Sequence, residues 1–265
     1  MSKSENSNKI KLFWEKKASD NAKKINSEMG NTLDDVNLRK LEIKAILKYI
    51  HNNQKVLDVG CGNGYSTINF ASSKKISIDG MDYSKQMILN ARKLLSYKRN
   101  KIKGKVNFFQ RDILDGNLDE EKYDVIITER CLINLGTWNK QKQALMNLHK
   151  YLKTGGNLLM IEGFKDNLNE INKIRLKYKL KPIDIVWHNL FFDKIKFEKF
   201  AKKYFKIEHI DNFGSTYMLI TRTLFHLLKD NYDKDIDRLA TLLPNFGNYN
   251  YQRLYILKKE PFKNK

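Results

Sequence analysis

The sequence is poor in cysteine and proline and has no long apolar run. Its 265 residues include two cysteines, Cys61 and Cys131, and three prolines. Two cysteines cannot build the disulfide framework of a small secreted protein, and the polar residues 1–9 do not resemble a secretory signal. No stretch approaches the roughly 20 apolar residues that span a bilayer. These absences predict a cytoplasmic protein, and a chain of this length can bury one well-packed core.

Arginine is also scarce, although the chain is strongly basic. Lysine and arginine total 50 against 30 acidic residues, which gives a net charge of +20, and nine of the basic residues are arginine. The scattered lysines favour a compositional bias over a nucleic-acid surface, where arginine would provide bidentate phosphate contacts. RNA binding is kept as the alternative. Cysteine and histidine do not cluster at ligand spacing, so the sequence predicts no metal site.

Apolar periodicity predicts an α/β fold. Residues 8–18 predict a short amphipathic helix anchored by Leu12, Phe13 and Trp14, and residues 33–50 predict a second helix with one apolar face. Strands and helices then alternate, which predicts a Rossmann-like, doubly wound, mostly parallel sheet of seven strands. The predicted strands are 55–59, 76–81, 106–109, 123–128, 157–161, 206–210 and 251–257.

The chain divides into an extension and a main domain. Residues 1–50 predict a helical amino-terminal extension, and residues 51–265 predict the domain that holds the sheet. Residues 214–247 predict a helical insertion before the last strand. Long insertions with their own secondary structure are often functional, so we expect both helical segments to act as a lid or substrate element.

A glycine-rich loop follows the first predicted strand. It reads Asp58-Val59-Gly60-Cys61-Gly62-Asn63-Gly64, which is D-x-G-x-G-x-G. Dinucleotide-binding loops read G-x-G-x-x-G, so this spacing disfavours NAD-linked redox chemistry. At this motif the chain resembles the class I S-adenosylmethionine-dependent methyltransferases. The resemblance extends over residues 56–161, with the two closing strands behind it.

The resemblance implies that S-adenosylmethionine is the cofactor. It places Asp58 near the ammonium group, Asp82 on the ribose hydroxyls, and Asp112 on the adenine amino group with Ile113 packed on the ring. The helix that follows the loop offers free N–H groups to the carboxylate. The complete predicted cofactor set is Asp58, Gly60, Cys61, Gly62, Asn63, Gly64, Asp82, Tyr83, Asp112, Ile113 and Glu129.

The segment after the fourth predicted strand, "ERCLINL", faces the transferred methyl group in this family. It is similar to the segment of small-molecule and glycan methyltransferases, and it lacks the Pro-Pro-aromatic motif of enzymes that methylate nucleobase amino groups. Cys131 has no neighbouring proline and is interpreted as a packing residue. The resemblance therefore predicts methyl transfer to oxygen or nitrogen of a small-molecule or sugar-derived acceptor. An RNA or protein methyltransferase and a non-catalytic cofactor-binding subunit are the alternatives.

Candidates for catalysis and acceptor binding lie at strand ends and in the loop 180–193. Histidine titrates near working pH, so His188 is a candidate general base, and Glu162 and Glu129 are the others. A hydrogen-bonded structural role for His188 is the competing interpretation. Arg39 and Arg222 are candidates to neutralise an anionic substrate. The predicted acceptor-binding set is Arg130, Trp187, His188, Asn189 and Arg222.

Overall fold

A computed structural model describes residues 3–22, 35–116, 122–228 and 235–260. Seven strands form one sheet in the order β3-β2-β1-β4-β5-β7-β6. The pairings are parallel except that β7 is antiparallel to both of its neighbours. This sheet confirms the predicted fold class. The strands are β1 Lys55–Val59, β2 Ser77–Asp82, β3 Lys105–Gln110, β4 Tyr123–Glu129, β5 Leu152–Gly163, β6 Phe205–Asp211 and β7 Gln252–Lys259.

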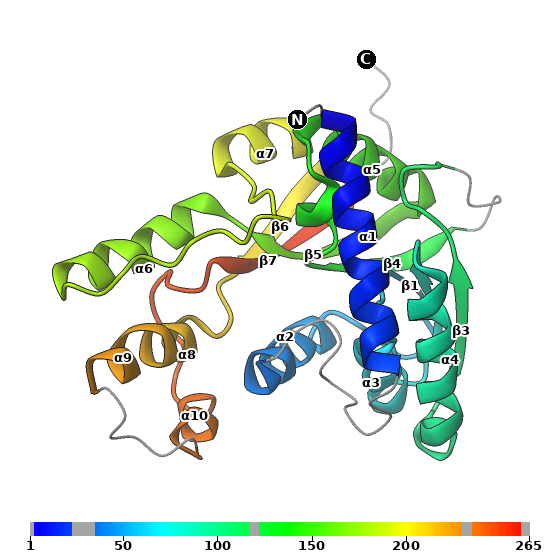
Figure 1. Ribbon diagram of the computed structural model, residues 1–265. Helices are drawn as coiled ribbons and strands as arrows, with labels where there is room; N and C mark the ends of the chain where they lie inside the picture. The colour runs from blue at the N-terminus through cyan, green and yellow to red at the C-terminus, as the bar shows by residue number, and fades with distance from the viewer. Residues whose placement is uncertain (1–2, 23–34, 117–121, 229–234, 261–265) are drawn as a thin grey trace.

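Helices cover both faces of the sheet. In Figure 1, α2 and α3 lie on one side of the sheet and α5 and α7 on the other, while α1 crosses in front of the strands. The main helices are α1 Lys3–Ala22, α2 Val36–Leu47, α3 Tyr65–Ser73, α4 Lys85–Lys98, α5 Trp138–Tyr151, α6 Lys165–Lys177 and α7 Lys194–Ala201. Short 3-10 turns, η1 Arg99–Lys101 and η2 Leu132–Leu135, follow α4 and β4.

The central strands are buried on both faces and supply the core. Leu57 of β1, Ile126 of β4 and Leu159 of β5 each have 0% exposure. Parallel strands covered by helices on both sides therefore appear in sequence as continuous apolar runs. Burying each such side chain stabilises the fold by about 1.5–3 kcal/mol. This rigid core fixes the carboxyl ends of the strands, where the candidate residues lie.

The predicted amino-terminal helix is present as α1, but one of its expected anchors is wrong. Ile10 and Ala18 are buried and Trp14 is partly buried, whereas Leu12 is 70% exposed. Residues four apart share one face of a helix, so Ile10, Trp14 and Ala18 form the inward face. Leu12 lies two positions from this row and points to solvent.

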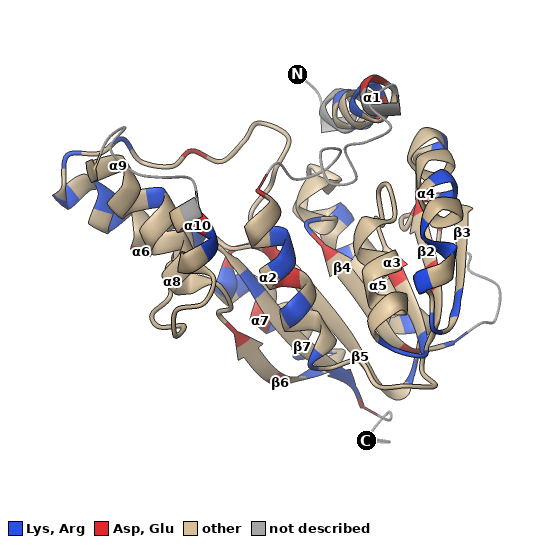
Figure 2. Cartoon of the chain, turned by 90° about the horizontal axis from the view of Figure 1, so that it is seen from below, with Lys and Arg blue, Asp and Glu red and all other residues tan. Residues whose placement is uncertain are grey.

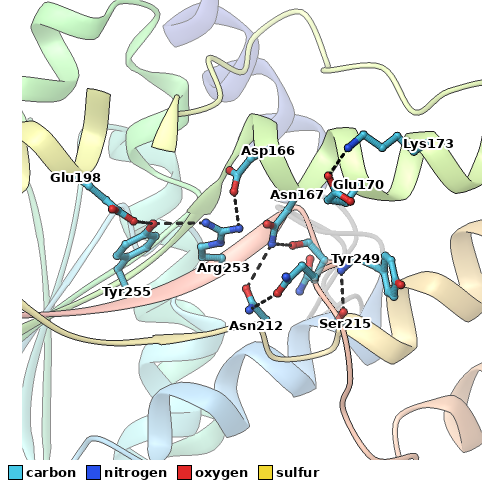
Figure 3. A network of polar contacts seen from close by, with 12 residues as sticks. Asp166, Asn167, Glu170, Lys173, Glu198, Asn212, Ser215, Tyr249, Arg253 and Tyr255 are labelled. Atoms are coloured by element: carbon cyan, nitrogen blue, oxygen red, sulfur yellow. Dashed lines mark hydrogen bonds and ion pairs between the residues drawn. The ribbon is translucent and has the colours of Figure 1, made fainter. Parts of the chain in front are cut away.

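The predicted insertion contains three helices in the described residues, with a π-helical turn between the first two. They are α8 Ser215–Leu219, the π turn η3 Ile220–Leu224, α9 Phe225–Leu228 and α10 Asp235–Ala240. Figure 3 shows the polar network that ties this insertion and α6 to β7. Asn167 donates to the Asn250 carbonyl at 2.7 Å, and Ser215 Oγ accepts from the Tyr249 amide at 2.8 Å. These bonds fix the residues that lead into β7.

Asp35 joins the extension to the insertion. One oxygen caps α2 by accepting from the Leu38 amide at 2.8 Å and also accepts from the Tyr217 hydroxyl at 2.8 Å. The other oxygen pairs with Arg222. A single carboxylate therefore satisfies a helix terminus and a partly buried cation at once.

We expect Asp35→Ala to lower the free energy of unfolding by about 2–4 kcal/mol, because it removes a cap and leaves Arg222 without this partner. Urea unfolding of the purified chain measures the change. Glu170→Ala is the matched control, since its ion pair with Lys173 is exposed and lies within one helix. Equal effects of the two substitutions would contradict the linking role of Asp35.

Candidate active site

Two adjoining cavities lie at the carboxyl ends of the central strands. The larger has a volume of about 310 Å³ and the smaller about 70 Å³. Ligands of open α/β sheets bind at this edge. The two cavities share lining residues and form one continuous site. The shared residues are Trp14, Gly60, Asp82, Tyr83, Cys131 and Asn134.

The glycine loop after β1 forms part of the cavity wall. Gly60, Gly62 and Gly64 have φ angles of 72°, 55° and 76°. A Cβ on Gly60 would lie 2.5 Å from Sγ of Cys131. Both the left-handed backbone and this close approach require glycine. Gly60 and Gly62 line the larger cavity, whereas Gly64 caps α3 and lines neither.

Asp82 ends β2 and lines both cavities. Its Oδ2 accepts from the Gly62 amide at 3.0 Å, and its Oδ1 accepts from the Ser84 amide at 2.9 Å. Burial raises the pKa of this carboxyl to about 6, and the two amide donors oppose that rise. The carboxylate thus holds the glycine loop in place and faces the junction of the two cavities.

Asp58 lies beneath the loop and lines neither cavity. The Thr67 hydroxyl of α3 donates to its Oδ2 at 2.5 Å. Burial and the nearby charge of Glu129 raise the pKa of Asp58. This hydrogen bond joins β1 to α3. Because Asp58 lines neither cavity, it would act on a ligand through its charge rather than by contact. Asn63, another predicted cofactor residue, is buried in the same loop outside both linings.

Four charged side chains meet at one end of the larger cavity. Arg130 pairs with Glu42 of α2, and Arg39 Nε lies 3.7 Å from the second oxygen of the same carboxylate. Arg39 also donates to Ser66 Oγ at 3.1 Å. Glu129 ends β4 here, and its Oε1 is buried with no hydrogen-bond partner among the described residues. This carboxylate oxygen is available to a cationic ligand.

The smaller cavity is bounded by the end of β3 and by α1. Asp112 and Ile113 line it, as the sequence predicts for a ring-binding pocket, and Ile113 is 5% exposed. Nζ of Lys11, on α1, lies 2.6 Å from Asp112 Oδ2. The backbone carbonyl of Lys11 accepts from the Tyr83 hydroxyl at 3.2 Å. Helix α1 therefore closes this cavity from outside the sheet.

His188 also lines the larger cavity, from the loop before α7. Its Nδ1 is 2.9 Å from Asn134 Oδ1. Phe13 stacks on its ring at 4.8 Å, and Trp14 meets it edge-on at 5.3 Å. Burial and the charge of Lys17 lower the pKa of His188, whereas a hydrogen bond with the neighbouring residue, Asn189, raises it. The prevailing downward shift favours a neutral imidazole at neutral pH.

Much of the remaining lining of the larger cavity is apolar. Leu168 of α6, Ile183 and Phe191 line it, together with Tyr251 and Gln252 at the start of β7. Gln252 is 5% exposed, and its Oε1 has no hydrogen-bond partner among the described residues. The wall thus combines apolar side chains with an amide oxygen that can accept from a ligand.

Glu162, a predicted general base, is occupied by the backbone. Its oxygens accept from the amides of Cys131 at 3.1 Å, Leu132 at 2.9 Å and Ile133 at 3.1 Å. Burial raises its pKa to about 7. It caps the turn η2 and lines neither cavity. This position favours a structural role, because the N–H groups at a helix start require an acceptor.

Two predicted acceptor-binding residues also lie outside both linings. Trp187 is 49% exposed, and its ring packs edge-on against Phe13 at 5.5 Å. Arg222 pairs with Asp35 and interacts with the Tyr251 hydroxyl. Asn189 and Arg130, in contrast, line the larger cavity. The acceptor set is therefore brought together only in part.

Both thiols lie at the site, and burial raises the pKa of each well above the usual range. Cys61 lines the larger cavity and Cys131 lines both. A neutral thiol is a poor nucleophile, which agrees with a packing role. Across the described ranges, no three His, Cys, Asp or Glu side chains are grouped to hold a metal ion. No described helix is both long and apolar enough to cross a bilayer.

Sequence reasoning missed several residues that line the site. The sequence predicts Trp14 only as a helix anchor and assigns no role to Asn134. It predicts Tyr251 and Gln252 only as the start of the last strand. Their placement depends on contacts between residues more than 100 positions apart, for which a single sequence has no local signal.

A family model described as a methyltransferase domain matches residues 50–234. The chain therefore belongs to this family, among the class I S-adenosylmethionine-dependent methyltransferases. An O-methyltransferase of Aspergillus nomiae is 28% identical over 113 residues, which cover 43% of this chain and 48% of that protein. The chain spans half or less of the first curated relatives it matches.

Two solved structures share the fold. Phosphoethanolamine N-methyltransferase 1 of Haemonchus contortus, in complex with phosphoethanolamine and S-adenosylhomocysteine, has a TM-score of 0.65 at 15% identity and covers 100% of this chain and 51% of that one. Magnesium protoporphyrin IX methyltransferase of Synechocystis, with bound S-adenosylmethionine, has a TM-score of 0.60 at 13% identity and covers 96% and 97% of the two chains. These similarities agree with the resemblance seen in the glycine loop.

The residues of the site fit the family's cofactor. S-adenosylmethionine carries positive charge on its sulfonium and ammonium groups, and the buried acids Asp58, Asp82 and Glu129 lie around the loop. The unpaired Glu129 oxygen suits the ammonium, and Arg39 suits the carboxylate. The smaller cavity has the apolar wall that a flat ring needs. A cation bound here would offset the burial that now raises the pKa of these acids.

Proposed function

We propose that the protein transfers a methyl group from S-adenosylmethionine to a hydroxyl group of a small, largely apolar acceptor. The observation that carries this proposal is the continuity of the site. The larger cavity is lined both by the glycine loop and Asp82 and by His188 and Gln252, so donor and acceptor groups would share one cavity. The similarity to an O-methyltransferase supports an oxygen acceptor.

The bound cofactor supplies a methyl group on a positively charged sulfur, which becomes a neutral thioether when the methyl leaves. Asp82, Glu129 and Arg39 bind and orient it, and α1 excludes water through Trp14. Orientation and exclusion of water can supply much of the rate in such a displacement. An oxygen acceptor must also lose its proton. The lowered pKa of His188 leaves a neutral imidazole to take that proton at neutral pH.

The apolar wall supports a small-molecule acceptor over RNA. RNA-binding surfaces gather cations, whereas Figure 2 shows lysine and arginine spread over α1, α2, α4 and α6. At the larger cavity, Arg130 is already paired with Glu42. The lining near His188 includes one lysine, Lys17, beside the apolar side chains of Leu168, Ile183 and Phe191. A protein acceptor and a non-catalytic role are tested in the same experiment.

Incubation with methyl-labelled S-adenosylmethionine tests the proposal against pooled phenols and alcohols, amines, nucleotide sugars, RNA and protein. We expect label in an organic-extractable product that resists acid, as a methyl ether does. Label confined to RNA or protein would overturn the small-molecule acceptor. Cofactor binding by calorimetry without transfer to any pool would favour a non-catalytic subunit.

Cofactor affinity is expected to fall as the pH drops below about 6. Asp82 has a pKa raised to about 6, and only its ionised form accepts from two ribose hydroxyls at once. The affinity for the cofactor is therefore at its maximum above this pKa, and it falls by up to about tenfold for each pH unit below it. Asp58 and Glu129, whose pKa values are also raised, act in the same direction.

Isothermal titration calorimetry from about pH 5 to about pH 8 measures this dependence. Asp82→Asn is the matched variant, because it cannot ionise and should show a weaker but flatter profile. Wild-type affinity that stays constant or rises toward acid would rule out the ionised Asp82 carboxylate as a ligand group.

A further inference from the structure

The Asn134 side chain makes three hydrogen bonds at the junction of the two cavities. Its Nδ2 donates to the Arg130 carbonyl at 2.7 Å. Its Oδ1 accepts from Trp14 Nε1 at 3.0 Å and lies 2.9 Å from His188 Nδ1. Asn134 belongs to the turn η2, whose start is held by Glu162. The amide is therefore anchored on a buried frame.

These contacts fix the orientation of the amide. An indole nitrogen is only a donor and a backbone carbonyl is only an acceptor. The atom facing Trp14 must therefore be the oxygen, and the atom facing the Arg130 carbonyl must be the NH₂ group. His188 Nδ1 meets the same oxygen, so in the neutral ring this nitrogen carries the proton. The other ring nitrogen, Nε2, then keeps its lone pair.

We propose that Asn134 is a positioning residue that holds His188 with its proton on Nδ1 and its basic lone pair on Nε2 when α1 is closed. This inference rests on the proposed function, since it explains how His188 is prepared to act as a base. Among the described hydrogen bonds, Asn134 is the one residue that bonds both Trp14 and His188.

Helix α1 provides most of the surroundings of His188. Phe13 stacks on the imidazole ring, and Trp14 donates to the same Asn134 oxygen that His188 contacts. The positive charge of Lys17 lowers the pKa of His188. Trp187 packs edge-on at 5.5 Å, and the Asn189 side chain favours the protonated ring. The base is therefore complete only when α1 lies over the site, which links closure to proton removal.

The proton and electron balance follows from this arrangement. The acceptor oxygen gives its proton to Nε2 as the new oxygen–carbon bond forms, and the electron pair of the broken carbon–sulfur bond stays on sulfur. The resulting imidazolium donates through Nδ1 to Asn134, which stabilises it. Nε2 then releases the proton to water, and the neutral ring is restored with its proton on Nδ1.

Heteronuclear NMR of the imidazole nitrogens tests the tautomer directly and needs no acceptor. We expect the wild-type His188 signals to report a protonated Nδ1, and Asn134→Ala to lose this preference. Asn134→Asp should restore it and, because a carboxylate favours the imidazolium, move the acid limb of kcat/KM to higher pH by about one unit. Trp14→Phe should lower kcat/KM about 2–10-fold, the value of one hydrogen bond.

Asn167→Asp is the matched control, since Asn167 is also buried and donates to a backbone carbonyl at 2.7 Å but lies away from His188. It is expected to lower stability without moving the pH limb. A wild-type spectrum with the proton on Nε2, or an unmoved limb in Asn134→Asp, would overturn the positioning role. If the wild-type spectrum shows the Nδ1 proton while His188→Ala retains full turnover, the base role of His188 fails and the proposed methyl transfer stands.

Discussion

Replacing His188 by alanine is expected to lower kcat about 10²- to 10⁴-fold, the usual contribution of a general base. Cofactor affinity should change little, because His188 lines only the larger cavity and contacts α1 and Asn134 rather than the glycine loop. The loss is expected to be uniform above the wild-type acid limb, because the substitution removes the proposed base rather than shifting its pKa.

The measurement is a steady-state assay with the acceptor found by labelling, combined with calorimetry for the cofactor. His209→Ala is the control, because His209 is exposed on β6. Thermal unfolding of His188→Ala should show a loss of about 0.5–1.5 kcal/mol in stability, because the substitution removes the stacking of His188 on Phe13. Near-normal turnover in a folded His188→Ala protein would reject the base role.

Replacing Asp82 by alanine is expected to raise the cofactor Kd about 100-fold or more. Each hydrogen bond to a charged carboxylate contributes about 1.5–3 kcal/mol, and two ribose hydroxyls would lose their acceptor. The same change frees the Gly62 amide, which Asp82 now holds at 3.0 Å, so the glycine loop also loses support. Both effects weaken binding.

Calorimetry measures the affinity, and circular dichroism checks that the sheet is intact. Asp79→Ala is the matched control, because Asp79 lies on the same strand but accepts from the Tyr123 hydroxyl at 3.1 Å, outside both cavities of the site. Equal affinity of the Asp82→Ala protein and the wild type would contradict the assignment of Asp82.

Local patterns were sufficient to predict the sheet and several of the residues that line the two cavities. Buried parallel strands are continuous apolar runs, which local sequence reports directly. Serine commonly caps a helix, and Ser84 caps α4 by accepting from the Met87 amide at 3.1 Å. Asp82 ends β2 and Asp112 lies two residues after β3, so both line cavities at the carboxyl edge of the sheet. The same rule also selected Glu162 and Asp58, whose side chains turn to Ile133 and Thr67 instead.

The acceptor side could be predicted only in part, because long-range contacts build it. His188 was a candidate on its chemistry alone, but its partner Asn134 lies 54 positions away and Trp14 lies 120 positions from Asn134. Arg222 was expected at the acceptor, yet it pairs with Asp35, 187 positions distant. Neither periodicity nor spacing reports such pairings, which depend on how helices dock on the sheet.

The position of α1 also bears on how ligands enter and leave the site. Trp14 borders both cavities, and Lys11 closes the smaller one against Asp112. We therefore expect the spent donor and the methylated product to leave past this same helix. If α1 acts as the proposed lid, one opening serves the exchange of both molecules, and the rate of that opening is an upper limit on the rate of turnover.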